Sequence, residues 1–258
     1  MSFLQPLARF FQEYLIQAVR VGPIPAHMAF VMDGNRRFAE TRRISVKKGH
    51  QMGIETLEQN LEICFRLGIH VVTMYAFSIE NFQRSPEEVA ALMDLAKAQI
   101  YQLSRPGGPL QRWNAKLQVL GRQELLRSDV QEALRVCSDS MSQGNEFVLN
   151  ICMPYTSRDE IAMAVQQTVR QHSRPFDTGC PITEESLSNN MLVSVDPPLN
   201  LLIRTSGASR LSDFLLWQCH QVTEIMVLNV LWPSFGWLGL LYVVLVWQHH
   251  LQTTSQKI

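Results

Sequence analysis

Residues 28–37 read MAFVMDGNRR, so an apolar run passes directly into a polar and basic segment. Short, wholly apolar runs are typical of strands in parallel sheets, because such strands are buried on both faces. The run IHVVTMYAF at 69–77 is a second of the same kind. Further apolar runs predict strands that cover residues 117–120, 147–152, 199–203 and 225–231.

Segments with helical periodicity lie between these strands. After the first strand we expect a polar loop up to Gly49, and then a helix that Gly68 ends; its apolar face comprises Ile54, Leu57, Leu61, Cys64 and Phe65. Ser85 and Pro86 fit the start of another helix. Alternation of strands and helices makes neighbouring strands parallel. The sequence therefore predicts a single α/β domain with a mostly parallel six-stranded sheet flanked by helices.

The composition is that of an ordinary folded protein. The chain has 258 residues, of which 46% are hydrophobic and 18% charged, and its formal net charge is zero. This balance excludes a disordered chain and gives no general reason to expect nucleic acid as a partner. Arginine accounts for 18 of the 23 basic residues, and its planar two-donor fork suits phosphate groups.

Polar segments follow three of the predicted strands, at residues 33–38, 78–84 and 204–213. The carboxyl ends of parallel strands meet at one edge of a sheet, where ligands bind. We therefore expect these segments to converge and to bring five arginines together with Asp33, the one carboxylate of the first segment. Such a set predicts a polyanion site, and a lone carboxylate suits a Mg²⁺ ion that bridges phosphate oxygens.

Each of these features also has a simpler interpretation. Asp-Gly-Asn at 33–35 is a good turn by itself. Ser85 and Glu88 fit a capping box, which favours a structural role for Glu88. The basic run 36–48 could be a solvated loop or a nucleic-acid patch. The neutral total argues against nucleic acid, and the coincidence of three such segments favours a functional site.

Four stretches are similar to the signature regions of the cis-prenyltransferases: MAFVMDGNRRFAE at 28–40, GH at 49–50, YAFSIENFQRSPEEV at 75–89 and LLIRTSGASRLSDFLLWQ at 201–218. The resemblance extends from about residue 21 to 233 and is closest to the catalytic subunits of eukaryotic dehydrodolichyl diphosphate synthases. It implies a parallel sheet with surrounding helices. It also implies an enzyme that condenses isopentenyl diphosphate onto farnesyl diphosphate, with Mg²⁺ as cofactor. The product implied is a long-chain polyprenyl (dehydrodolichyl) diphosphate, the precursor of the dolichol used in protein glycosylation.

The resemblance also implies roles for individual residues. Those placed at the reacting groups are Asp33, which would hold Mg²⁺, with Asn35, Ser78 and Asn81. Those that would bind or position the two diphosphate substrates are Gly34, Arg36, Arg37, His50, Phe82, Arg84, Arg204, Arg210 and Ser212.

A growing hydrocarbon chain needs an apolar tunnel. Two helical stripes are candidates for its walls: Val89, Leu92, Met93 and Ala96 in one helix, and Ile54, Leu57 and Leu61 in the other. Their simpler interpretation is ordinary hydrophobic core, which is the more frequent role of such stripes.

The two ends of the chain carry apolar helical patterns. Residues 1–22 are expected to form an N-terminal amphipathic helix, which packs on the body of the protein or touches a membrane. Residues 23–258 are then the catalytic domain, with an apolar C-terminal helix at 235–250. No charged residue occurs from 225 to 256, yet the apolar run 235–247 is too short to span a bilayer. We expect this helix to lie against a partner subunit or in a membrane surface.

Departures from the family pattern concern subunit assembly. Bacterial members carry a metal-binding Glu at the position of Thr223, and Glu224 is adjacent but out of register. They also carry an Arg-x-Gly motif that completes the neighbouring active site, whereas Arg210 is the last arginine here. The resemblance to eukaryotic subunits implies that a Nogo-B-receptor-like partner supplies this motif, in a heteromer at the cytosolic face of the endoplasmic reticulum.

Two other interpretations are kept beside the enzyme. The chain could be a non-catalytic stabilising subunit of the same complex, although such subunits lose the Asp and several arginines that this chain has. It could also be a membrane-anchored protein with an inert phosphate site, which Mg²⁺ and isopentenyl diphosphate would not protect against heat.

Overall fold

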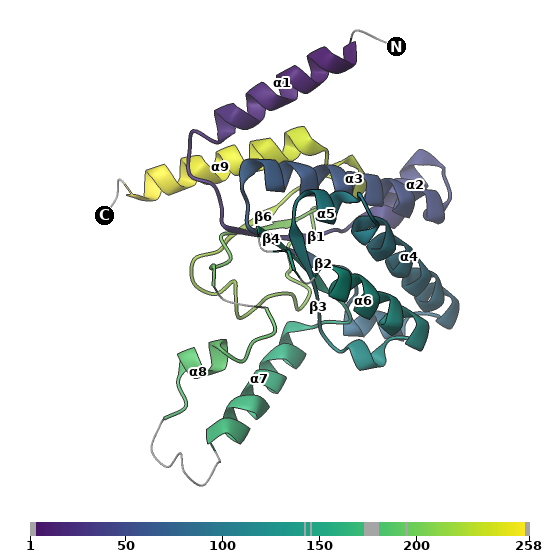
Figure 1. The fold of residues 1–258 in the computed structure, drawn as a ribbon, viewed down its shortest axis with the longest axis vertical. Coiled ribbons are helices and arrows are strands. Elements are labelled where there is room, and N and C mark those ends of the chain that lie inside the picture. The colour runs from purple at the N-terminus through teal and green to yellow at the C-terminus, as the bar shows by residue number, and fades with distance from the viewer. Residues whose placement is uncertain (1–3, 142, 145, 173–180, 194–195, 256–258) are drawn as a thin grey trace.

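The computed structural model describes residues 4–141, 143–144, 146–172, 181–193 and 196–255. Its centre is a six-stranded sheet in the order β3-β4-β2-β1-β5-β6, and every neighbouring pair of strands is parallel. The prediction of a single α/β domain with a six-stranded, parallel sheet is confirmed (Figure 1). The strands are β1 (His27–Val31), β2 (Val71–Tyr75), β3 (Ala115–Leu120), β4 (Phe147–Cys152), β5 (Leu201–Arg204) and β6 (Glu224–Val227).

The strand order places the three polar segments side by side. Strand β1 pairs with β2 on one side and with β5 on the other, so Val31 lies between Tyr75 and Arg204. The chain reverses its direction of winding at β1, and in open parallel sheets the crevice at such a switch point binds ligands. The predicted convergence of segments 33–38, 78–84 and 204–213 is therefore a consequence of this topology.

The two faces of the sheet bury two separate clusters. Met28 and Phe30 of β1 point into the larger cluster, whereas Ala29 and Val31 point into the smaller one, because successive side chains of a strand alternate between faces. The larger cluster includes residues of helices α3, α4, α6 and α9. Helices of eight residues or more are α1 (Leu4–Val19), α2 (Asn35–Arg42), α3 (Val46–Leu67), α4 (Pro86–Ser104), α6 (Ser128–Ser140), α7 (Ser157–His172) and α9 (Trp237–Ser255).

Short helical segments complete the layers. They are α5 (Pro109–Arg112) and α8 (Glu184–Ser188), with the 3₁₀ turns η1 (Ile79–Gln83), η2 (Gln123–Leu125) and η3 (Trp232–Ser234). Helices α7 and α8 project from the sheet at the end of the molecule opposite α1 (Figure 1).

The segment between β1 and α3 differs from the expected polar loop. It contains helix α2, and α3 already begins at Val46. Gly34 and Arg43 have positive φ angles of 111° and 54° and bound α2 at its two ends. The prediction was wrong because α2 is short and strongly polar, so it carries no apolar stripe by which a helix is recognised.

The N- and C-terminal helices lie against each other and against α3 (Figure 1). Ile16 of α1 and Val244 of α9 are fully buried, and Gln248 of α9 donates hydrogen bonds to the carbonyls of Val19 and Pro23. One face of α9 is thus covered by this chain itself, whereas we expected a partner subunit or a membrane surface there. For the exposed face of α9 that expectation stays a prediction. Among the described helices, none has the length and apolar character needed to cross a membrane.

Candidate functional site

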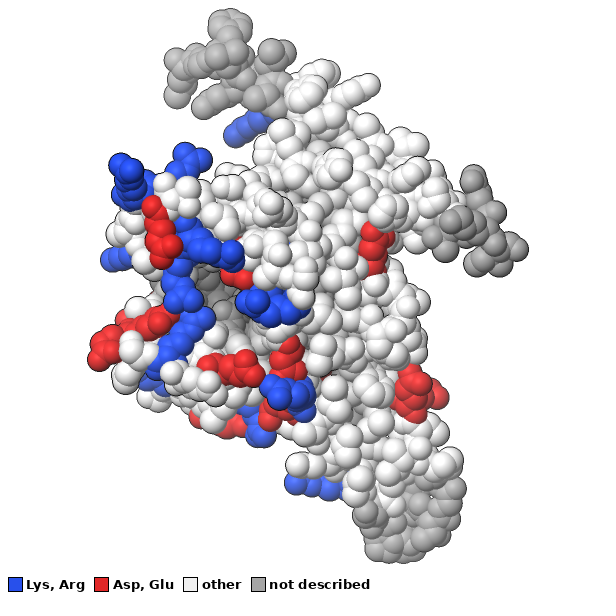
Figure 2. Space-filling model, turned by 180° about the vertical axis from the view of Figure 1, so that it is seen from behind, with Lys and Arg blue, Asp and Glu red and all other residues white. Residues whose placement is uncertain are grey.

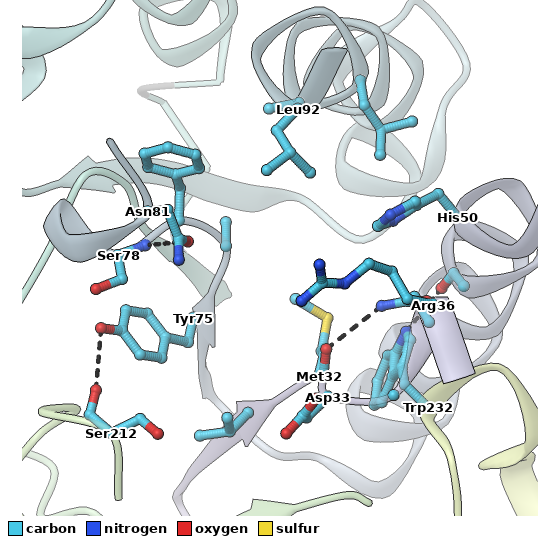
Figure 3. A pocket seen from close by; sticks show the side chains of 18 of the residues that line it. Met32, Asp33, Arg36, His50, Tyr75, Ser78, Asn81, Leu92, Ser212 and Trp232 are labelled. Carbon is cyan, nitrogen blue, oxygen red and sulfur yellow. Dashed lines mark hydrogen bonds between the residues drawn. The ribbon is translucent and has the colours of Figure 1, made fainter. Parts of the chain in front are cut away.

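A cavity of about 860 Å³ opens where β1, β2 and β5 end. Figure 2 shows a hollow on this face with basic side chains around its rim. Seen from close by, side chains from both sides of the hollow point into it (Figure 3). The predicted site residues among its lining are Asp33, Gly34, Asn35, Arg36, Arg37, His50, Ser78, Asn81, Arg84, Arg204, Arg210 and Ser212.

Asp33 and Arg204 form the centre of the site. Asp33 Oδ2 accepts a hydrogen bond from Arg204 Nη2 at 2.9 Å, and Oδ1 accepts a longer one from Arg37 at 3.4 Å. The Arg204 side chain is only 3% exposed, while that of Asp33 is 31% exposed toward the cavity. Burial disfavours the ionised carboxyl, but Ser206, the hydrogen bond from Arg204 and the charges of Arg204 and Arg37 outweigh it and lower the pKa of Asp33. The carboxylate is therefore ionised at neutral pH.

Close packing fixes the turn that follows Asp33. Gly34 has φ 111°, and a Cβ atom there would come within 2.8 Å of Leu231 Cδ2. Asn35 starts α2 with its side chain directed at Gly53, where a Cβ would lie 2.3 Å from Asn35 Oδ1. The Oδ1 atom is buried and has no hydrogen-bond partner. A side chain is therefore strained at Gly34, and a side chain at Gly53 would displace that of Asn35.

Arginines and one histidine line the side of the cavity near α3 and α4. Glu88 Oε1 accepts hydrogen bonds from Arg84 at 2.6 Å and from Arg36 at 3.3 Å. His50 of α3 is half-buried; burial, together with the charges of Arg36 and Arg84, lowers its pKa. The imidazole is therefore neutral at pH 7 and can accept or donate one hydrogen bond.

Glu88 corrects the capping-box interpretation. Ser85 Oγ does accept from the Glu88 backbone N–H, as predicted. The Glu88 carboxylate does not complete a capping box, however, because it binds Arg84 and Arg36 instead. It sets the position of two cavity arginines, and sequence spacing could not show this because Arg36 lies 52 residues away.

The segment after β2 holds Ser78 and Asn81 together. Asn81 Oδ1 accepts from the Ser78 N–H at 3.0 Å, while Ser78 Oγ caps the turn η1 by accepting from Glu80 N–H. Both side chains border the cavity (Figure 3). Phe82 does not line it: its ring packs against Phe77 and borders a neighbouring groove.

The loop after β5 is tied to Arg204. Arg204 Nη1 donates to the Arg210 carbonyl at 2.8 Å and to Ser212 Oγ at 2.7 Å, and its Nε is buried without a partner. Tyr75, to which the sequence pattern assigned no role in the site, donates from its hydroxyl to the carbonyls of Ser212 and Tyr155, both at 3.2 Å. Its position at the end of β2 was the one available signal for this role.

Asp213 anchors the same loop to helix α7. Ser212 and Asp213 have φ angles of 53° and 58°, which most non-glycine residues avoid. Asp213 Oδ1 accepts from the Arg158 N–H at 3.0 Å and Oδ2 from Arg158 Nε at 2.8 Å, while its carbonyl accepts from Ser157 N–H. These bonds at the N-terminus of α7 hold the strained backbone in place.

Asp213→Ala is therefore expected to lower the free energy of unfolding by roughly 0.5–2 kcal/mol, the range typical for loss of a side-chain acceptor at a helix N-terminus, because the Arg158 N–H loses its partner. Asp213→Asn keeps an acceptor and tolerates positive φ, so it is expected to lie much closer to the wild type. Chemical unfolding followed by circular dichroism measures the difference. Equal stability of Asp213→Ala and the wild type would show that the anchor contributes nothing.

The inner part of the cavity is apolar. Its walls are Leu57 of α3 and Leu92, Leu95 and Ala96 of α4. Ile54, Leu61 and Met93 are buried instead, and Val89 borders the neighbouring groove. In each of the two predicted stripes, some residues therefore line the cavity and the others do not.

A divalent cation fits this site only with help from a ligand. The described residues contain no cluster of three or more His, Cys, Asp or Glu side chains. Glu224 starts β6, at the edge of the sheet away from Asp33, and pairs with His250 at 2.6 Å. Asp33 is the carboxylate that binds Arg204 and Arg37, and Mg²⁺ is commonly bound by one or two carboxylates together with substrate phosphates. The site therefore fits a Mg²⁺ ion that Asp33 and the phosphate groups of a ligand bind together.

Comparison with known proteins identifies the family. Residues 31–254 match the model of the family described as "Putative undecaprenyl diphosphate synthase". The chain is 41% identical over 222 residues to a dehydrodolichyl diphosphate synthase complex subunit of Schizosaccharomyces pombe, covering 86% of this chain and 84% of that one. It is 36% identical to a tritrans,polycis-undecaprenyl-diphosphate synthase (geranylgeranyl-diphosphate specific) of Pyrococcus abyssi, covering 94% and 91%.

A solved structure agrees with this assignment. Lavandulyl diphosphate synthase from Lavandula x intermedia, in complex with dimethylallyl diphosphate, superposes with a TM-score of 0.76 at 27% identity, covering 87% of this chain and 95% of that one. The family model, the curated relatives and the shared fold show that this chain belongs to the undecaprenyl diphosphate synthase-like prenyltransferases.

Proposed function

We propose that this chain catalyses the condensation of isopentenyl diphosphate onto an allylic diphosphate and thereby makes a long-chain polyprenyl diphosphate. The observation that carries the proposal is the cavity itself: Asp33 and the arginines line one part of it, and apolar side chains of α3 and α4 line another. A prenyl diphosphate has the same division into an anionic head and a hydrocarbon tail.

The allylic diphosphate is assigned to the side of the cavity formed by α2. Arg36 and Arg37 lie on its first turn and supply positive charge, and Gly34 allows the backbone to approach a phosphate closely. His50 lines the same part of the cavity. This arrangement leaves the hydrocarbon tail free to enter between α3 and α4.

Isopentenyl diphosphate is assigned to the loop after β5. Arg210, Ser212 and the orphaned Nε of Arg204 supply donors there. Arg204 binds Asp33 as well, so one guanidinium connects the two diphosphate positions. Two anions can be held side by side only where positive charge separates them, and this explains the use of arginine at both.

In the reaction, the bond between C1 of the allylic substrate and its diphosphate oxygen breaks, and the isopentenyl double bond attacks C1. A proton then leaves the new chain for a diphosphate oxygen. Arg36, Arg37 and Arg204 stabilise the negative charge that develops on the leaving diphosphate, and Ser78 and Asn81 lie near the reacting carbons. Asp33 would hold Mg²⁺, which would supply further electrostatic stabilisation of that charge when bound.

A catalytic role is favoured over that of a non-catalytic stabilising subunit. Asp33 and its arginine partners are all present, and they are organised around one cavity by hydrogen bonds. The Schizosaccharomyces pombe relative is named as a complex subunit. This name supports a heteromer, in which a Nogo-B-receptor-like partner supplies the Arg-x-Gly motif.

The product is assigned as dehydrodolichyl diphosphate, following the name of that relative. Farnesyl diphosphate is assigned as the primer because the family resemblance of the sequence implies it. Geranylgeranyl diphosphate is the alternative primer, because the Pyrococcus abyssi relative is named as specific for it. Assays with both primers distinguish the two.

The cytosolic face of the endoplasmic reticulum membrane is the proposed location. Two described helices carry exposed apolar side chains: Phe10, Phe11 and Tyr14 on α1, and Leu238, Tyr242 and Leu245 on α9. These helices lie side by side (Figure 1). Exposed aromatic and aliphatic groups on such helices suit peripheral contact with a membrane surface or an anchored partner.

The test is incorporation of labelled isopentenyl diphosphate, with farnesyl diphosphate and Mg²⁺, by the full chain alone and by the chain co-expressed with a Nogo-B-receptor-like subunit. We expect long-chain product, mainly with the partner present. An equal amount of product from the chain alone would support the catalytic role and contradict the need for a partner subunit. Absence of product from both, with each protein folded and a positive control active, would support the non-catalytic interpretation.

A further inference from the structure

Helices α3 and α4 face each other across the inner part of the cavity. Leu57 lines it from α3, and Leu92, Ala96 and Gln99 line it from α4 at helical spacing. Helix α4 packs mainly against α6 and α5. The part of the cavity that α3 and α4 line together is available to a ligand.

A polar contact joins the two helices just beyond the lining residues. Gln102 Nε2 donates to Glu58 Oε1 at 2.9 Å, and both side chains are partly buried. Gln102 follows Gln99 by three residues, so it lies on the same helical face. Glu58 directly follows Leu57. This hydrogen bond connects the two walls at the inner end of the row of lining residues.

A long prenyl chain cannot fit in front of this contact. From Leu92 to Gln99 the wall extends for roughly 10 Å along α4, given the rise of 1.5 Å per residue. Each condensation adds a further five-carbon unit, so a growing chain reaches the contact after few additions. Hydrocarbon offers no donor or acceptor, and passage between Glu58 and Gln102 therefore requires their hydrogen bond to break.

We propose that Glu58 and Gln102 form a polar gate that closes the inner end of the prenyl tunnel and sets the chain length at which elongation slows. The inference rests on the proposed function, because it assigns a specificity-determining role within the same cavity. It differs from the role of a simple brace between helices: a brace contributes to stability, whereas a gate also discriminates between chains that end before it and chains that must pass it.

The first experiment measures product chain lengths of the full chain with its partner subunit. Glu58→Ala and Gln102→Ala are expected to raise the ratio of long to short products about fivefold, which corresponds to the roughly 1 kcal/mol net value of one hydrogen bond. The double variant is expected to match each single variant, because the two residues act through one bond. Glu58→Gln retains an acceptor for Gln102 and should keep the wild-type distribution.

Glu55→Ala is the matched control, since Glu55 is an exposed carboxylate on the same helix. An unchanged distribution in folded Glu58→Ala, or a shift as large in Glu58→Gln or Glu55→Ala, would overturn the gate. Neither result would decide the proposed function, which is tested separately by the prenyl transfer activity of the wild type.

The second experiment needs no turnover. Thermal stabilisation is measured with all-trans prenyl diphosphates of increasing chain length, each added with Mg²⁺. The chain length beyond which stabilisation declines is expected to be greater in Glu58→Ala and Gln102→Ala than in the wild type or in Glu58→Gln. The same limit in all four proteins would contradict the gate, even if farnesyl diphosphate stabilises each of them.

Discussion

Asp33→Asn is expected to lower the rate of prenyl transfer by about 10²- to 10³-fold, the range typical for loss of one preorganised group that stabilises transition-state charge. The amide has nearly the shape of the carboxylate but lacks its charge, so it binds Mg²⁺ poorly. Steady-state turnover at saturating substrates measures the effect. Asp94→Asn, which alters an exposed carboxylate paired with Arg127, is the matched control.

The Asp33 variant also has a predictable pH signature. Because the pKa of Asp33 is lowered in the folded protein, its ionised form stabilises the fold above the ordinary pKa of the side chain. This contribution is lost as the pH falls through the folded-state value, below about pH 4. We therefore expect the stability difference between wild type and Asp33→Asn to shrink as the pH is lowered from 6 toward 3. A difference that does not depend on pH would contradict the assigned Asp33–Arg204 interaction.

Removal of the charge at Asp33 also affects Arg204. The Arg204 side chain is 3% exposed, so the variant leaves a nearly buried cation with a neutral partner. Asp33→Ala is for this reason a poorer test than Asp33→Asn, because it removes the hydrogen-bond acceptor as well. A turnover rate equal to that of the wild type in either variant would contradict the assignment of Asp33 as a Mg²⁺ ligand.

Arg204→Lys is expected to reduce kcat/KM by about 100-fold, equivalent to the loss of one or two hydrogen bonds to charged groups at about 1.5–3 kcal/mol each. The guanidinium binds Asp33 through Nη2, and the Arg210 carbonyl and Ser212 Oγ through Nη1. A lysine ammonium is a single point and cannot span these partners while its Nζ also faces a diphosphate. Kinetics with each substrate varied in turn will measure the loss.

Two further variants separate the role of Arg204 from a general effect of charge. Arg210→Ala removes an exposed arginine from the same loop and is expected mainly to raise the KM for isopentenyl diphosphate. Arg135→Lys, on the exposed face of α6, is expected to behave like the wild type. An unchanged KM in Arg210→Ala would argue against the assignment of isopentenyl diphosphate to this loop.

The sequence by itself determined the strands and the segments that follow them. Apolar runs such as residues 147–152 correspond to strands because burial on both faces of a sheet demands continuous hydrophobicity. Ser85 and Gly68 mark helix ends because their capping interactions are local. The parallel order follows from the alternation of strands and helices, and it places Asp33 and Arg204 at neighbouring strand ends.

Only the tertiary structure decided which side chains of these segments meet. Glu88 was expected to cap its own helix, yet it binds Arg36, which lies 52 residues away. Leu57 and Leu61 share one helical stripe, yet the first lines the cavity and the second is core. A one-dimensional pattern records how apolar a position is and how it repeats. It does not record the distance between two helices, and that distance determines whether an apolar side chain meets another side chain or an open cavity.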